Sequence, residues 1–324
     1  MKSTLLSATV VFALFALSIG SCKKKETMAV PSTSGCTSTI YGYSGSSWLD
    51  TNNYFGVVNT SAATISSSGT LMHYMLYSNQ GAYNGADGYY YTLQATNNSS
   101  QSVGPLYKIN SGGAVITMAA ASGAGPYASL TYNKATNKLY CIAAGNLAEV
   151  TPGSSSFTTT SIASPVHRFY VGYTSSSMTV NNNNGDLYYV TGDTAGYFIE
   201  KYHAGAGSTV VATGGAAWEI LGMRYNENDN RLYAIRMKFV GTTPIYDLIT
   251  IDPSSGTISS LTTLAVCNPE FFSACINPCT NRYIFSTMGA TGAILDQYSI
   301  TGSLLQHDTL SAPFMGLDVW TTSM

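Results

Sequence analysis

The sequence predicts an all-β fold, a six-bladed β-propeller, from three observations. A hairpin signature occurs six times, most clearly over residues 132–140, where an extended run enters a polar turn and leaves as a run headed by an aromatic residue. The last residues of the six copies stand at positions 41, 90, 140, 188, 233 and 284, with spacings of 49, 50, 48, 45 and 51. Amphipathic helical patterns of useful length are absent from the sequence. A repeat of this length predicts a propeller or a solenoid.

A second hairpin lies between successive copies of the first. Residues 248–258 show it best, because Asp252-Pro253 and Gly256 supply ordinary turn chemistry between two extended runs. Counterparts cover residues 55–66, 106–118, 147–160, 198–212 and 295–306. Two hairpins in each unit predict four antiparallel strands, which is the anatomy of a propeller blade.

The two ends of the chain complete one unit between them. Residues 314–320 resemble the opening strand at 219–225, but the chain stops before a partner strand, and residues 37–41 can supply it. We therefore expect the propeller to be closed by one blade shared between the N- and C-termini, which removes exposed sheet edges. The innermost strands are expected near residues 314–320, 71–77, 127–133, 169–181, 218–225 and 270–276.

The N-terminal residues predict targeting rather than fold. Lys2 precedes an apolar run over residues 5–17, and Ile-Gly-Ser-Cys at 19–22 resembles the lipobox of bacterial lipoproteins. We expect a signal peptide over 1–21, lipidation of Cys22, a flexible tether over 22–35 and one propeller over 36–324. The alternative is an ordinary secretory signal that contains a cysteine by coincidence.

Composition limits the classes of partner. Only 9% of residues are charged and the formal net charge is −2, so the sequence lacks the basic footprint of a nucleic-acid binder. Turns rich in Asn and Asp, such as 181–186, match no EF-hand spacing and are interpreted as structural turns. Phosphate-binding loops are absent from the sequence. We therefore expect no cofactor and no metal.

Five cysteines remain after Cys22. Cys275 and Cys279 flank the turn of one hairpin copy and are the candidate disulfide in an oxidising envelope. Free structural thiols are an alternative. A zinc site is a third, although no second close pair of Cys or His accompanies the first in the sequence.

The strand pattern, repeat length and expected closure resemble the six-bladed propellers of the NHL, YWTD and TolB-like class. Residues 187–193, Leu-Tyr-Tyr-Val-Thr-Gly-Asp, resemble the YWTD motif. The leader makes the chain similar to lipoproteins of the Bacteroidota envelope. The resemblance covers residues 36–324 and implies the fold; it transfers no site residue and no activity.

Candidate site residues come from the loops that lead into the innermost strands, because such loops surround one mouth of a propeller channel. Glu219 and Glu270 each stand six residues before the equivalent positions Tyr225 and Ile276. Paired carboxylates suit the acid and base of glycoside hydrolysis, and they equally suit capping of backbone N–H groups. The expected binding residues are His73, Tyr127, His167, Arg168, Trp218, Glu219, Glu270, Phe271 and Phe314.

The first functional hypothesis is a non-enzymatic, lipid-anchored module that binds or scaffolds a glycan or a protein at the bacterial envelope, with the outer membrane as the expected location. The alternatives are a hydrolase or lyase acting on saccharides at the central funnel, with Glu219 and Glu270 as weak catalytic candidates, and a structural subunit of an envelope complex. No Gly-x-Ser-x-Gly elbow is present to favour a serine hydrolase. Beyond the membrane contact through Cys22 and a glycan or protein partner, no nucleic acid is expected.

Overall fold

A computed structural model describes residues 35–44, 53–72, 81–93, 104–120, 127–169, 177–193, 196–215, 219–265, 267, 272–289 and 291–323. All lie in one compact unit, Thr33–Met324. The regular elements in these ranges are all strands, so the all-β prediction is confirmed. No helix in these ranges has the length and apolar character to cross a membrane.

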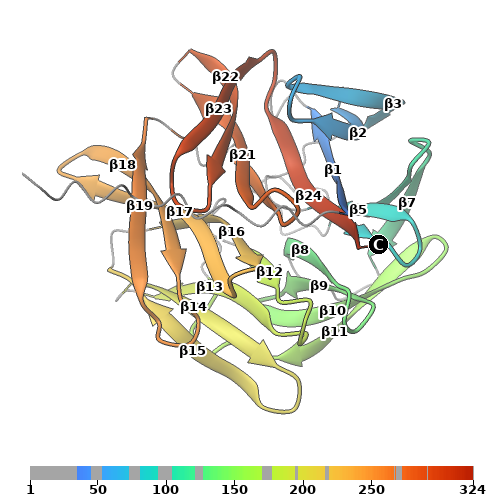
Figure 1. Cartoon of the computed structure of the whole chain (residues 1–324). Helices are drawn as coiled ribbons and strands as arrows, with labels where there is room; N and C mark the ends of the chain where they lie inside the picture. Colours follow the sequence, from blue (N-terminus) through green and yellow to red (C-terminus); the bar gives the residue numbers. More distant parts are fainter. Residues whose placement is uncertain are drawn as a thin grey trace, which may run out of the picture. The chain divides into compact units, whose positions relative to one another are not determined.

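The strands form five sheets (Figure 1). One has the order β24-β1-β2-β3, with β24 at Phe314–Ser323, β1 at Cys36–Ser44, β2 at Asn53–Asn59 and β3 at Thr64–Met72. A second has the order β12-β13-β14-β15, with bounds Met178–Val180, Leu187–Asp193, Gly196–His203 and Gly207–Thr213. A third has the order β16-β17-β18-β19, with bounds Glu219–Asn226, Arg231–Val240, Thr243–Ile251 and Ile258–Leu264. A fourth has the order β20-β21-β22-β23, with bounds Ser273–Asn277, Arg282–Gly289, Gly292–Ser299 and Leu304–Leu310.

The fifth sheet has eight strands in the order β4-β5-β6-β7-β11-β10-β9-β8. The bounds of β4 to β7 are Gly81–Asn84, Tyr89–Leu93, Leu106–Asn110 and Val115–Ala120, and those of β8 to β11 are Tyr127–Asn133, Lys138–Ala143, Asn146–Pro152 and Ser156–Ala163. Its two halves join where β11 pairs in parallel with β7, through Ser156 opposite Ala119 and Phe157 opposite Ala120. In the part of the chain that the structure describes, there are therefore four separate four-stranded sheets and one of eight strands, where six sheets of four strands were expected.

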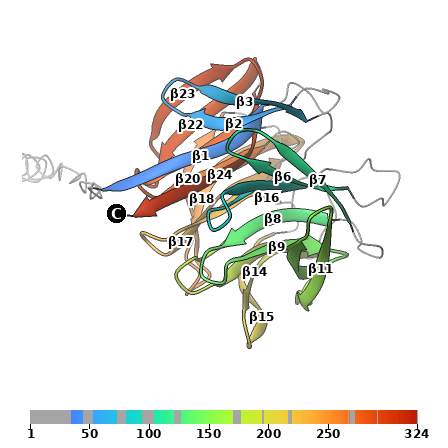
Figure 2. The ribbon, with the colours of Figure 1, turned by 90° about the vertical axis from the view of Figure 1, so that its right-hand side faces the viewer.

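The sheets have a propeller-like arrangement, in which each inner strand lies beside two others. Strand β24 contacts β4, β4 contacts β8, β8 contacts β12, β12 contacts β16, β16 contacts β20 and β20 contacts β24 (Figure 1). The first and last strands pair antiparallel from Cys36 opposite Ser323 to Ser44 opposite Phe314, and Figure 2 shows them side by side in blue and red.

One of the expected inner strands is placed wrongly. The second inner strand is β4, not residues 71–77, because Leu71 and Met72 continue β3 and pair with Tyr54 and Asn53. The fourth described inner strand, Met178–Val180, lies within the expected range of 169–181. Apolar runs predict strands, but they do not distinguish the end of an outer strand from the start of the next inner strand.

The repeated hairpin turn is built by an asparagine at the end of the inner strand. The Asn133 Oδ1 accepts hydrogen bonds from the backbone N–H groups of Ala135 and Thr136, at 3.0 and 3.2 Å. Corresponding bonds to Oδ1 of Asn84, Asn181, Asn226 and Asn277 come from the residue two positions later. The turn ends in the left-handed region, at Asn137 with φ 54° and at its equivalents Gly88, Gly185, Asn230 and Asn281. Asparagine suits both positions, which explains why the sequence repeats it.

Hydrogen bonds also join each inner strand, or the turn that follows it, to a neighbouring repeat. The Asn133 Nδ2 donates to the Gly185 carbonyl at 3.0 Å, and the Asn181 Nδ2 donates to the Tyr225 hydroxyl at 2.9 Å. The remaining links join Asn228 to Pro278, Asn277 to Ser38, Tyr83 to Asp318, and Tyr132 to the backbone of Ala86. The turns therefore connect neighbouring sheets as well as neighbouring strands.

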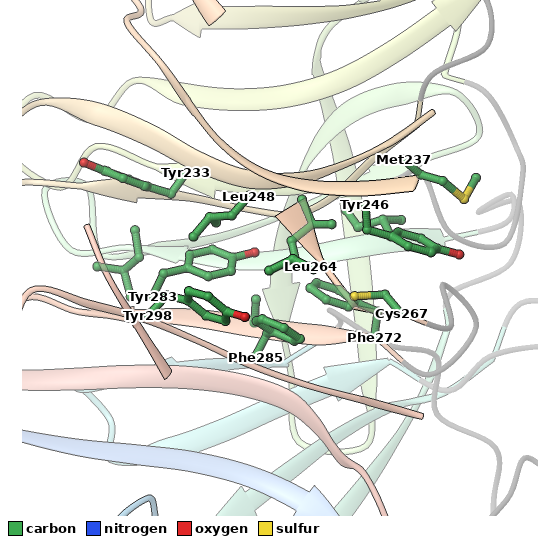
Figure 3. Close-up of a cluster of buried hydrophobic side chains, with 14 residues drawn as sticks. Tyr233, Met237, Tyr246, Leu248, Leu264, Cys267, Phe272, Tyr283, Phe285 and Tyr298 are labelled. Carbon is green, nitrogen blue, oxygen red and sulfur yellow. The ribbon is translucent and has the colours of Figure 1, made fainter. Parts of the chain in front are cut away.

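Apolar and aromatic side chains fill the space between sheets. Figure 3 shows the cluster between the sheet of β16 to β19 and the sheet of β20 to β23, where Tyr233, Leu248, Tyr283 and Phe285 are all 2% exposed or less. Burial of each such side chain stabilises the fold by about 2 kcal/mol before entropy is counted. The aromatic residue that ends the hairpin signature is a core residue, as Tyr233 illustrates.

The disulfide differs from the expected one. Cys36 bonds to Cys279, with a Cα–Cα distance of 5.4 Å, whereas Cys275 is a buried free thiol, like Cys141 and Cys267. Cys275 lies within β20 opposite Ile284, while Cys279 lies in the following turn, beside the start of β1. The pairing of Cys275 with Cys279 is therefore wrong, because the fold brings a residue that is distant in sequence closer to the turn.

Replacement of Asn133 by alanine should destabilise the protein, because two turn N–H groups and the Gly185 carbonyl lose their partner in a site where Asn133 is 0% exposed. We expect a loss of about 1–3 kcal/mol in the free energy of unfolding, measured by urea denaturation. Asn183→Ala is the matched control, since this exposed turn residue contributes only its backbone N–H to the turn. Equal losses in the two variants would contradict the role of the Asn133 side chain.

Removal of the disulfide by the double replacement Cys36→Ser and Cys279→Ser should lower the free energy of unfolding by about 2–4 kcal/mol. Reductant should bring the wild-type protein to the stability of the double variant and leave the variant unchanged. Intact mass with and without reductant checks the bond itself. A wild-type mass that does not rise under reduction would contradict it.

Candidate functional site

A small cavity lies among the inner strands, towards the ends that carry the asparagine turns. Its volume is about 90 Å³, and residues of β4, β8, β12, β16, β20 and β24 line it together with the turns that follow β8, β12, β16 and β20. The lining includes Lys134, Asn182, Glu227 and Pro278 from these turns. The cavity is thus shared by all six inner strands, which makes it the candidate binding site.

The repeat register determines which side chains line this cavity. The residue that pairs with the last position of each hairpin signature is a lining residue in every copy. These residues are Asp318, Tyr83, Thr131, Thr179, Arg224 and Cys275, which pair with Tyr41, Tyr90, Tyr140, Tyr188, Tyr233 and Ile284. Because side chains alternate between the two faces of a strand, equivalent positions point into equivalent surroundings. Only two of the six, Arg224 and Asp318, carry a charge.

Arg224 is a partly buried cation with incomplete hydrogen bonding. Its two terminal nitrogens donate to the carbonyls of Met223 and Leu317, at 3.0 and 3.4 Å. Its Nε is buried and has no hydrogen-bond partner among the described residues. A guanidinium has five N–H donors in a planar fork. Arg224 therefore retains donors for a further acceptor.

Asp318 is the acidic counterpart of Arg224 in the cavity. Its carboxylate accepts the backbone N–H of Tyr83 at 2.7 Å. Burial raises the pKa of Asp318, and this effect outweighs the Tyr83 N–H and the positive charges of Arg224 and Lys134, which lower it. The nearby Arg224 charge likewise lowers the pKa of the Cys275 thiol, which burial nonetheless raises to about 12. The charge of Arg224 thus affects the pKa of both Asp318 and Cys275.

Lys134 provides a second cation, in the turn after β8. Its Nζ donates to Thr321 Oγ1 at 3.0 Å and lies 4.5 Å from the centre of the Trp320 ring. Trp320 stands next to Tyr83, with ring centres 5.5 Å apart, and Tyr83 stacks on Tyr41 at 4.2 Å. These cation–π and aromatic contacts hold the Lys134 side chain in place at the edge of the cavity.

Of the two glutamates predicted from the sequence, Glu219 is described and does not line this cavity. Glu219 begins β16, at the opposite end of that strand from the turn, and is half-buried. Glu270 lies outside the described residues, as do His73, Trp218 and Phe271. The expected carboxylate pair therefore stays a prediction.

The other predicted binding residues pack against the fold. Phe314 is 4% exposed in the hydrophobic core, so it does not form part of an exposed rim. Tyr127 packs its ring on Phe157, with centres 5.2 Å apart. Arg168 is exposed, and its carbonyl accepts the Gly192 N–H.

His167 is held by a buried carboxylate. Glu200, which is 0% exposed, accepts the backbone N–H groups of Val166 and His167 at 2.8 Å each, and its Oε1 lies 3.1 Å from the His167 Nδ1. The imidazole stacks on Phe198 at 3.5 Å. These contacts give His167 a structural role at the end of its segment.

A wider groove lies at the same turns, between the sheet of β12 to β15 and the sheet of β16 to β19. Its volume is about 450 Å³, and its lining includes Tyr188, Lys201, Arg231 and Asp252. Arg231 and Asp252 lie 3.9 Å apart. The cations of this groove, Lys201 and Arg231, each lie within 4.0 Å of a carboxylate of the protein, unlike the cations of the cavity.

The described residues hold no group of three or more His, Cys, Asp or Glu side chains that could bind a metal ion. Among the described residues the cavity offers the hydrogen-bond donors of Arg224 and Lys134, the tyrosine rings, and the carboxylates of Asp318 and Glu227. The arrangement can bind an anionic or polar group.

No family model matches this chain, and no curated protein sequence matches it. Solved structures resemble it. A chain of a nidogen/laminin complex has a TM-score of 0.60 at 10% identity, over 87% of this chain and 98% of that chain. TolB from Acinetobacter baumannii has a TM-score of 0.60 at 10% identity, over 89% and 67%. The periplasmic gluconolactonase of Pseudomonas aeruginosa has a TM-score of 0.55 at 10% identity, over 87% and 99%. At these identities the likeness shows the fold alone, a β-propeller.

Proposed function

We propose that this protein is a non-enzymatic binding module of the bacterial envelope, which engages a protein partner at the cavity among its inner strands. The observation that carries the proposal is the register of the repeat, which directs one residue of every copy to this cavity and places Arg224 there with free donor capacity. A site shared by all the repeats is where the scaffold is rigid and the side chains are free to vary.

The proposal includes a six-bladed propeller. Counting the eight-stranded sheet as two blades, whose strand pairing with each other is limited to two residue pairs between β7 and β11, gives six blades of four strands. The sheet that contains β24 and β1 is then the closing blade, and the disulfide from Cys36 to Cys279 ties it to the neighbouring blade.

A protein partner is the form of the proposal that has most support. One of the similar structures was solved as a nidogen/laminin complex, and another is a TolB. The cavity also suits a protruding side chain better than a sugar ring, since about 90 Å³ equals the share of roughly three water molecules in the liquid.

The envelope location is proposed from the leader. Residues 1–21 are the signal peptide, Cys22 carries the lipid, and residues 22–35 are the tether to the propeller at 36–324. Similar structures that include a TolB and a periplasmic gluconolactonase are consistent with an envelope protein. An outer-membrane location is the finer form of this proposal.

Replacement of Cys22 by alanine should release the protein from membranes, because acylation requires the thiol. We expect the wild-type protein in the membrane fraction with a metabolically incorporated fatty-acid label, and the variant unlabelled. Cys36→Ser is the matched control, since it removes a cysteine that the disulfide uses. Labelling of the Cys22 variant would contradict the anchor and leave the binding proposal untouched.

Site-specific photo-crosslinking in envelope preparations tests the binding function. A photoreactive residue in place of Glu227, which lines the cavity, should give a discrete crosslinked species that protease digestion removes. The same residue in place of Thr158, exposed on β11, is the control. Equal yields at both positions, or no product at Glu227, would contradict the proposed site, and a product that resists protease would favour a glycan partner.

A further inference from the structure

The cations of the cavity differ from most other cations of the protein in having no carboxylate partner. Six lysines and arginines of the described residues lie within 4.0 Å of an Asp or Glu oxygen: Lys108, Lys138, Lys201, Arg231, Arg236 and Lys238. Within the same described ranges Arg224 and Lys134 form no such ion pair. Arg282 also lacks one, but it donates to the Gln297 Oε1 at 3.0 Å, and Arg168 is exposed.

An unpaired cation in a partly buried site is costly, because it loses hydration without gaining an anionic partner. The cost of lost hydration is not offset at the Arg224 Nε, because this nitrogen is buried and has no acceptor among the described residues. Asp318 compensates in part, since the two charges influence each other across the cavity, but no ion pair joins them. An external carboxylate would supply the missing charge and could accept from the remaining N–H groups of the two terminal nitrogens, each of which makes one hydrogen bond to a carbonyl.

From these contacts we infer that the cavity recognises a carboxylate on a peptide segment of the partner, with Arg224 as the deep ligand and Lys134 as the cation nearer the turns. This inference rests on the proposed binding function and names the chemistry of its partner. The guanidinium fork binds a carboxylate through two parallel hydrogen bonds, which an ammonium cannot do.

The walls of the cavity support a short acidic side chain or a chain terminus as the occupant. Leu130, Met178 and Ile276 are apolar and suit the methylene groups that carry a carboxylate. Glu227 and Asp318 are the carboxylates of the lining, and both disfavour a second anion unless it reaches the cations. A carboxylate is therefore selected by position, since it gains stabilisation only at Arg224 and Lys134.

Titration with three synthetic peptides tests the inference on the full-length protein. The peptides are acetyl-Gly-Asp-Gly-amide, its Asn counterpart, and acetyl-Gly-Gly-Gly with a free C-terminal carboxylate. The readout is the side-chain Nε–Hε resonance of Arg224, assigned by its loss in Arg224→Lys. We expect a carboxylate peptide to shift this resonance and the Asn peptide to leave it unchanged. The free-acid and Asp peptides distinguish a chain terminus from an acidic side chain.

Arg224→Gln should weaken binding of the effective peptide by about tenfold to a hundredfold, the range for a hydrogen bond to a charged group. Arg282→Gln removes an arginine outside the cavity and should bind as the wild type does. Thermal melting checks that the variants fold, and Lys134→Met, a change in a turn, gives a second variant in which binding should weaken. Equal binding of the Asp and Asn peptides, or unchanged binding by Arg224→Gln and Lys134→Met, would overturn the inference.

The crosslinking experiment separates this inference from the proposed function. If the photoreactive residue at Glu227 captures a partner equally in the presence and absence of Arg224→Gln, binding at the cavity stands and carboxylate recognition fails. If Glu227 captures no partner while the Asp peptide still binds at Arg224, the cavity chemistry stands and the envelope function fails.

Discussion

The hydrogen bond from an inner-strand asparagine to the turn that follows it is the interaction on which the rest of the structure depends. At Asn133 a single side-chain oxygen fixes two turn N–H groups, and the amide nitrogen of the same side chain reaches the neighbouring sheet at Gly185. One side chain thus stabilises the turn and also binds the neighbouring repeat. Because the protein has few charged residues, 9% of the chain, such neutral polar links replace surface ion pairs in joining its sheets.

Fixing the turn also fixes the register of the strand before it. The residue opposite the final position of each hairpin signature lines the cavity in all six copies, whereas the residue at that final position packs between sheets, as Tyr233 does in Figure 3. In each copy, the residue that lines the cavity therefore pairs with a residue that belongs to the core. The core position is a tyrosine in five of the six copies, whereas the cavity-lining position differs between copies and includes Cys275, Thr131, Arg224 and Asp318.

The candidate site differed from expectation for a geometrical reason. The sequence led to the loops that precede the inner strands, where Glu219 stands, and the described cavity lies towards the other ends of these strands. Both ends of a propeller channel are surrounded by loops, and periodicity treats them alike. The signal that could have found Arg224 was already in the repeat: it pairs with Tyr233, the residue that marks its copy. The repeat pattern alone does not indicate that this register position lines the cavity.

The sequence by itself determined the all-β class, the two hairpins of each unit, the turns at Asn133, Asn181, Asn226 and Asn277, and the partnership of the chain's two ends. These features depend on local spacing and turn chemistry, which residues close in sequence decide. Only the tertiary structure decided that Cys279 bonds to Cys36 rather than to Cys275, that β7 and β11 merge eight strands into one sheet, and that Arg224 lies without a carboxylate partner among the described residues. Each of these depends on which distant segments meet, and no local pattern carries that information.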